Sequence, residues 1–288
     1  MNRILIITVS YKGAESTEGF LRSASYLEGF SESHVIVVEN ASNDGSAERL
    51  RSFINQFPNV ELLESAQNRG YFGAASWALK QYAARSSQPD WTIVCNNDIQ
   101  FNNCQFLAKL LQIDTENAGV IAPSIIELPV GVDCNPFMRG RPSLFKLLRC
   151  KFWNSSYYLM WFKQWLSPYV RSLRHRLFRE RVPTQTPGPV YAPHGAFLIF
   201  SKLFFESGGY IDDGFFLYAE EFAVAEICRR LNLPVIHDPR LRVWHNAHAV
   251  TGRMCNRNTF QYGREGLNYA LRTYFFPAQE RKISDLEI

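Results

Sequence analysis

Residues 91–98, WTIVCNND, show most directly how this chain folds. The stretch begins with an apolar, partly β-branched run and ends in two amides and a carboxylate. Three earlier runs have the same character, and they read RILIITV (3–9), HVIVVE (34–39) and VELLE (60–64). Strands that are apolar along their whole length are typical of a parallel sheet covered on both faces.

Segments with helical spacing of apolar residues separate and follow these runs, near 17–30, 46–57, 73–85 and 103–113. Alternating strands and helices predict βαβ units, and therefore an α/β fold with a mostly parallel central sheet flanked by helices. Ligands of such sheets bind beyond the C-terminal ends of the strands. The residues after each run are therefore the first candidates for a functional site.

Small, polar or acidic residues follow all four runs. They read TVSY (8–11), ENASNDGS (39–46), QNRGYFGAA (67–75) and NND (96–98). Each motif alone is compatible with ordinary turn and cap chemistry, because Asn, Asp, Gly and Ser dominate turns. Four such motifs at one edge of a sheet indicate a surface that holds a polar ligand.

The charge of the chain is unevenly distributed. The 288 residues include 31 Lys and Arg against 27 Asp and Glu, but eleven of the basic residues and one acid fall within 139–181. That segment carries +10 and the remainder −6, which indicates an anionic partner. Ten aromatic residues are interleaved between 145 and 178, a composition typical of protein segments that lie on a membrane surface. Two alternatives are that the segment binds single-stranded nucleic acid or that it forms a helical lid packed on the core.

The composition excludes several classes of protein. A hydrophobic share of 46% with 17 Gly and 14 Pro is not that of a disordered or collagen-like chain. No apolar run approaches the roughly 18 residues of a membrane-spanning helix, and residues 1–13 do not read as a secretory signal. The six Cys include no CxxC pair, so we expect reduced thiols and a cytoplasmic protein.

The order of the motifs resembles glycosyltransferase family 2. A strand ending in Ser-Tyr is followed by N-x-S-x-D-G-S, N-x-G-[FY]-x-G, N-x-D, G-A, F-x-x-[YG]-x-E-[DE] and a late His, and the resemblance covers roughly 3–128 and 190–265. It implies the GT-A (nucleotide-diphospho-sugar transferase) fold and inverting transfer from a UDP- or dTDP-sugar to a glycan hydroxyl. Such relatives commonly extend lipid-linked glycans of bacterial O-antigen, lipopolysaccharide or capsule.

The resemblance also implies roles for individual residues. Asp98 and His245 would hold a divalent cation, Mn²⁺ or Mg²⁺, and the carboxylate oxygens of Asp98 are the ligands that such a hard cation prefers. The family usually has Asp where Glu39 stands, so the reach of that contact differs. The residues that match its donor-binding positions are Thr8, Ser10, Tyr11, Glu39, Asn40, Asp44, Asn68, Gly70, Gly73, Asn96 and Asn97.

For the acceptor side, the resemblance implies that Glu221 is the general base, with Glu220 as the rival. A helix N-terminus would stabilise either carboxylate in its charged form, which is the structural alternative. Arg264 is a weak candidate for a phosphate contact. The residues matching the loop that shapes the acceptor side are His194, Gly195 and Ala196.

Four segments follow from this reading: a nucleotide-sugar-binding half (1–128), a basic aromatic insertion that is helical and membrane-facing (129–189), an acceptor and catalytic half (190–250) and a C-terminal helical segment (251–288). We expect peripheral association with the inner face of the cytoplasmic membrane and no binding of nucleic acid. Two alternatives stay open. One is a catalytically inactive nucleotide-sugar-binding scaffold, and the other is a sugar nucleotidylyltransferase, although SYKGAEST (10–17) is not the Gly-rich basic loop that such enzymes need.

Overall fold

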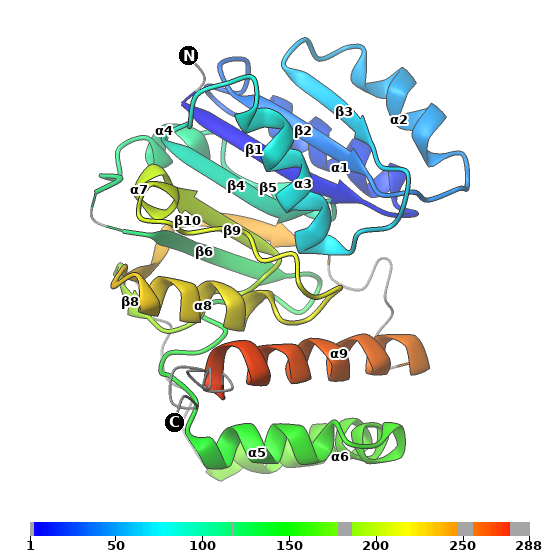
Figure 1. Cartoon of the computed structure of the whole chain (residues 1–288), viewed down its shortest axis with the longest axis vertical. Coiled ribbons are helices and arrows are strands. Elements are labelled where there is room, and N and C mark those ends of the chain that lie inside the picture. Colours follow the sequence, from blue (N-terminus) through cyan, green and yellow to red (C-terminus); the bar gives the residue numbers. More distant parts are fainter. Residues whose placement is uncertain (1–2, 117, 178–185, 247–255, 277–288) are drawn as a thin grey trace, which may run out of the picture.

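One ten-stranded sheet forms the centre of the protein (Figure 1). The computed structural model describes residues 3–116, 118–177, 186–246 and 256–276, with the side chains of 168–177 excluded. The sheet order is β3-β2-β1-β4-β9-β6-β10-β5, with β7 paired to β6 and β8 to β10. The strands are β1 (Ile4–Ser10), β2 (His34–Glu39), β3 (Val60–Glu64), β4 (Trp91–Asn96), β5 (Ile99–Phe101), β6 (Val120–Glu127), β7 (Val132–Asp133), β8 (Gly188–Val190), β9 (Phe197–Ser201) and β10 (Val235–His245).

The predicted parallel core is confirmed. Strand β1 pairs in parallel with β2 and β4, β2 pairs in parallel with β3, and β6 pairs in parallel with β10. Strand β9 enters antiparallel between β4 and β6 and so joins the two halves of the sheet. The short strands β7 and β8 lie at the two ends of the segment predicted as a helical insertion, and they form because β6 and β10 offer them backbone partners.

Helices cover both faces of the sheet and bury two apolar cores. One core packs α1, α2 and α4 on the sheet around Phe20, Phe106 and Phe197. The other packs α3, α7 and α8 on the opposite face around Phe72 and Phe204. The helices are α1 (Ala14–Ser25), α2 (Ser46–Ile54), α3 (Tyr71–Ala83), α4 (Phe106–Leu110), α5 (Leu144–Trp153), α6 (Tyr157–Leu177), α7 (Lys202–Glu206), α8 (Glu220–Arg230), α9 (Arg257–Ala270) and the π-helix η1 (Leu271–Phe275).

The basic aromatic insertion is helical, as predicted, and forms an outer layer. Helix α9 lies beside α5 and α6, which are on the far side of α9 from the sheet in Figure 1. Tyr157 of α6 packs against Phe260 of α9, with ring centroids 5.8 Å apart. Within the described ranges, no helix is long and apolar enough to cross a membrane.

Candidate functional site

The loop after β2 is shaped by the carboxylate of Glu39. This buried side chain accepts hydrogen bonds from the backbone N–H groups of Ala41 (3.1 Å) and Ser42 (3.0 Å), and from the Ser42 hydroxyl. The Ser42 hydroxyl oxygen in turn accepts the backbone N–H of Lys12 at 2.9 Å, which ties this loop to the loop after β1. The Glu39 carboxylate therefore holds the loop after β2 in place, and its hydrogen bonds are made to groups of the protein itself.

Asn40 connects the loops that follow β2 and β3. Its amide nitrogen donates to Asn68 Oδ1 (2.9 Å) and to the carbonyl of Gly70 (3.1 Å). Its amide oxygen accepts the backbone N–H of Arg69 at 2.9 Å. All of these groups lie at the predicted donor edge, so one buried amide fixes two neighbouring loops to each other.

Two further residues predicted to contact the donor, Ser10 and Asn97, brace the start of α1. Ser10 Oγ accepts a hydrogen bond from the Thr17 hydroxyl at 2.9 Å. The amide nitrogen of Asn97 donates to the Gly13 carbonyl and to Thr17 Oγ1, both at 3.0 Å. Thr8 and Ser10 are fully buried in β1, so neither hydroxyl is open to a ligand.

Among the predicted donor-binding residues, Tyr11 and Asp44 have the exposed side chains. Tyr11 is 37% exposed. Asp44 accepts the backbone N–H of Ser46 at 3.1 Å, and hydrogen bonding from Ser46 lowers the pKa of the Asp44 carboxyl. Asn96, half-buried at the end of β4, donates its backbone N–H to the Ala196 carbonyl at 2.9 Å. The predicted loops therefore converge on one edge, as the strand order requires.

Asp98 and His245 come together at the C-terminal ends of β4 and β10. Asp98 lies in the turn between β4 and β5, and His245 ends β10, the strand that pairs with β5. Asp98 Oδ1 is 3.1 Å from His245 Nε2, and the two side chains are only 10% and 9% exposed. The oxygen is buried and accepts no aligned hydrogen bond from the described residues. Such an oxygen suits a hard cation, because a bound ion would replace the missing donor.

Few side chains among the described residues could serve as ligands for such a cation. Among the described residues, no three His, Cys, Asp or Glu side chains form a cluster that could hold a metal ion. Mg²⁺ is commonly held by one or two carboxylates together with substrate phosphates and water. The pair Asp98 and His245 therefore fits a cation that is shared with a phosphorylated ligand.

Glu220 and Glu221 begin α8 and differ in their surroundings. Glu220 is 5% exposed, and its burial, together with the charge of Glu221, raises its pKa to about 8. Glu221 is more exposed, and its Oε1 accepts the backbone N–H of Gly195 at 3.2 Å. At neutral pH Glu220 therefore keeps its proton, while Glu221 is the more accessible of the two.

His194 lies between the glutamates and the Asp98–His245 pair. Its backbone N–H donates to Asn135 Oδ1 (2.7 Å), and its Nδ1 accepts the N–H of Ala196 (3.2 Å), which places the ring proton of the neutral form on Nε2. Burial lowers the pKa of His194, an effect that the nearby Glu221 opposes. The rings of His194 and His245 are 6.2 Å apart between centroids, so the predicted acceptor and metal sides adjoin.

Tyr71, in the first turn of α3, connects these groups. Its hydroxyl donates to the carbonyl of Gly195 at 3.1 Å. Burial raises the pKa of Tyr71 well above its usual value, and the nearby acidic groups of Glu220, Asp98 and Glu221 add to the rise. Tyr71 occupies the [FY] position of the motif N-x-G-[FY]-x-G, but nothing in the sequence indicated its contact with Gly195, which is 124 residues away.

The loop before α8 is fixed at two points. Gly70 has φ +72°, and a Cβ there would lie 2.1 Å from the Phe216 carbonyl oxygen, so the donor loop and this loop touch backbone to backbone. The carboxylate of buried Asp212 accepts hydrogen bonds from the hydroxyls of Tyr269 in α9 (2.9 Å) and Tyr274 in η1. The position of Glu220 and Glu221 therefore depends on contacts with both α3 and α9.

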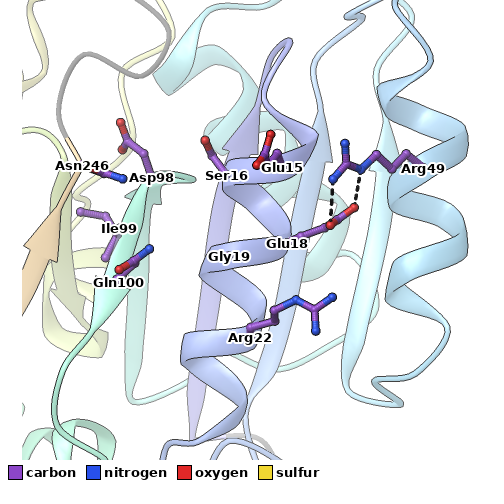
Figure 2. Close-up of a pocket in the computed structure, with 10 residues that line it drawn as sticks. All are labelled: Glu15, Ser16, Glu18, Gly19, Arg22, Arg49, Asp98, Ile99, Gln100 and Asn246. Atoms are coloured by element: carbon purple, nitrogen blue, oxygen red, sulfur yellow. Dashed lines mark hydrogen bonds and ion pairs between the residues drawn. The ribbon is translucent and has the colours of Figure 1, made fainter.

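A cavity of about 450 Å³ borders the turn between β4 and β5 that contains Asp98 (Figure 2). Figure 2 shows Asp98 on one side and Glu15 and Ser16, at the start of α1, on the other. Glu18 receives two hydrogen bonds from the Arg49 guanidinium, at 2.5 and 3.0 Å.

The last predicted residue, Arg264, is exposed on α9, and its guanidinium lies 5.5 Å from the centroid of the Phe260 ring.

Comparison with known proteins agrees with this arrangement. Residues 5–201 match the family described as Glycosyl transferase family 2. The chain is 26% identical over 259 residues to N-acetylglucosaminyl-diphospho-decaprenol L-rhamnosyltransferase of Mycobacterium tuberculosis, covering 86% of this chain and 77% of that relative.

Two solved structures share the fold at 14% identity. They are the structures of GalNAc-T7 with UDP, GalNAc and Mn²⁺ (TM-score 0.61) and of S. aureus TarS 1-349 with UDP-GlcNAc (TM-score 0.54). The matches cover 93% and 94% of this chain, but 47% and 67% of theirs. The GT-A fold is thereby confirmed.

Proposed function

The chain belongs to glycosyltransferase family 2, and from this premise we propose that it transfers a sugar, with inversion, from a nucleoside diphosphate donor to a glycan hydroxyl. The donor is a UDP- or dTDP-sugar, and the acceptor is a lipid-linked glycan of a bacterial surface polysaccharide. The observation that carries the proposal is the gathering of Asp98, His245 and Glu221 around Tyr71 and His194. A lipid-linked acceptor is supported by the name of the mycobacterial relative.

The donor end of the site is formed by the joined loops after β1, β2 and β3. Tyr11 and Asp44 are exposed there and are the side chains that a nucleoside would meet. Asp98 and His245 would hold a divalent cation against the diphosphate. A bound Mn²⁺ or Mg²⁺ stabilises the negative charge that develops on a leaving diphosphate.

Glu221 acts on the acceptor. It accepts the proton of the attacking hydroxyl while that oxygen forms a bond to the anomeric carbon, and the bond from this carbon to the diphosphate oxygen breaks with its electron pair. Attack from the side opposite the leaving group inverts the anomeric centre. Glu220 is unsuited to this role at neutral pH, because its raised pKa keeps it protonated.

The test compares Glu221→Gln with Glu220→Gln in the same transfer assay. Loss of a general base lowers the rate by about 10²–10⁴, so Glu221→Gln should lose transfer while Glu220→Gln retains most of it. Nucleotide binding is followed separately, by the rise in melting temperature with nucleotide sugars and Mn²⁺ or Mg²⁺. Both variants should keep this rise.

Other outcomes favour the alternatives. Wild-type protein that binds nucleotide sugars without transferring any sugar would indicate the inactive scaffold. Formation of a nucleotide sugar from a nucleoside triphosphate and a sugar phosphate would indicate a nucleotidylyltransferase. Absence of any nucleotide-sugar binding would contradict the proposal as a whole.

A further inference from the structure

The outer helix α6 exposes the face that a helix normally buries. Five large side chains recur at positions i, i+3, i+4, i+7 and i+8, the spacing of an amphipathic stripe that faces a core. In this protein each of them is at least 36% exposed, and Tyr158 reaches 71%. They are Tyr158, Trp161, Phe162, Trp165 and Leu166.

Helix α5, which contacts α6, exposes large apolar side chains as well. Its side chains Leu144, Phe145, Leu148 and Phe152 are between 53% and 75% exposed, whereas Leu147 is 4% exposed and belongs to the core. We call the nine exposed side chains of α5 and α6 the apolar platform. Helices α5 and α6 lie on the far side of α9 from the sheet (Figure 1), and the exposure of the nine side chains makes the platform part of the outer surface.

Basic residues accompany the platform, and acids are missing from its part of the sequence. Between Asp133 and Glu180 there are ten Lys or Arg residues and no Asp or Glu. Among the described side chains of the two helices, the basic ones are Lys146, Arg149, Lys151 and Lys163. A partner that covers the platform must therefore present apolar area and negative charge together.

We propose that α5 and α6 dock this protein onto the surface of an anionic lipid bilayer, with the apolar platform in the interfacial layer. Trp and Tyr favour that layer, and each Lys or Arg near an anionic leaflet strengthens binding about fivefold. A second copy of the chain is a poorer occupant, because a two-fold contact would set these cations against themselves. Nucleic acid would stack on aromatic rings and leave Leu144, Leu148 and Leu166 without apolar partners.

The test is co-sedimentation of the whole chain with two kinds of vesicle, phosphatidylcholine alone and phosphatidylcholine mixed with phosphatidylglycerol. Wild type should bind the mixed vesicles and bind them less well at high salt. The triple variant W161S/F162S/W165S should bind them at least about tenfold more weakly, since it removes much of the apolar area available for burial. Tyr26→Ser is the control, because Tyr26 is an 81% exposed aromatic side chain that follows α1, outside α5 and α6.

A second triple variant tests the charges. R149S/K151S/K163S should weaken binding to the mixed vesicles by about a hundredfold at low salt and leave any binding to phosphatidylcholine alone unchanged. Melting temperatures of both triple variants should stay close to that of wild type, because the altered side chains are exposed. If a triple variant does not fold, Trp161→Ser and Lys163→Ser alone should each give a smaller loss in the same direction.

Several outcomes would overturn the proposal. Wild type that sediments with neither vesicle is one, and equal binding by wild type and W161S/F162S/W165S is another. So is a wild-type dimer that this variant dissociates without any vesicle binding, or binding of single-stranded nucleic acid in place of vesicles through the same side chains. None of these outcomes depends on sugar transfer, so the proposal can fail while the proposed function stands.

Discussion

Replacing Glu220 by Gln is expected to remove a pH dependence from the stability of this protein. Burial, and then the charge of Glu221, raises the pKa of Glu220 from 4.5 to about 8 in the folded state. Between these values the folded chain binds a proton that the unfolded chain has lost, so the free energy of unfolding falls as pH rises. The rise in pKa corresponds to at most about 5 kcal/mol, lost at a slope approaching 1.4 kcal/mol for each pH unit.

Urea denaturation at a series of pH values from about 5 to about 9 measures this slope. In Glu220→Gln the slope should be shallower by about 1 kcal/mol for each pH unit, whatever constant offset the buried amide adds. Glu206→Gln serves as the control, because Glu206 forms an exposed ion pair with Lys202 and should leave the slope unchanged. Parallel curves for wild type and Glu220→Gln would refute the reasoning, since they would show that the group does not hold a proton in the fold.

Two further predictions concern stability. Gly70→Ala should cost about 3 kcal/mol and weaken nucleotide binding, because the new Cβ meets the Phe216 carbonyl oxygen at a left-handed position. Gly45→Ala, also at a left-handed position but in open space, should cost only about 1 kcal/mol. Thermal denaturation measures both losses, and equal losses would contradict the close approach of Gly70 to the Phe216 carbonyl. Glu226→Ala should cost about 2–3 kcal/mol, because it removes a buried carboxylate that accepts hydrogen bonds from the half-exposed Arg141 (2.7 Å) and from Tyr191 (2.6 Å); a loss below 1 kcal/mol in urea denaturation would show that these bonds do not stabilise the fold.

The strands of the first half could be predicted from the sequence almost residue by residue. The expected ranges 34–39 and 60–64 coincide with β2 and β3, because in a covered parallel sheet the apolar run ends where the strand ends. Helix α1 begins at Ala14, earlier than the expected 17, since Asn97 and Thr17 fix the turn at Gly13 from outside the helix pattern. The place of β9 between β4 and β6 has no local signal, because strand order is set by tertiary pairing.

The candidate site was predictable in position more than in detail. Strand ends and motif order indicated Asp98 and His245, and the pairing of β10 with β5 brings them within 3.1 Å. Asn135 and Tyr71 were missed, because each acts on the backbone near His194 from a distant element. The use of Glu39 within its own loop could not be inferred either, since a carboxylate that shapes a loop and one that binds a ligand look alike in a sequence.

The amide of Asn40 has a thermodynamic consequence for any ligand that binds at the donor edge. Its bonds to Asn68, Arg69 and Gly70 hold two loops in one arrangement in the free protein. The conformational entropy of these loops is therefore lost during folding and not again during association. Calorimetry of nucleotide binding should accordingly show a smaller entropic penalty in wild type than in Asn40→Ala, whose loops would have to become ordered around the ligand.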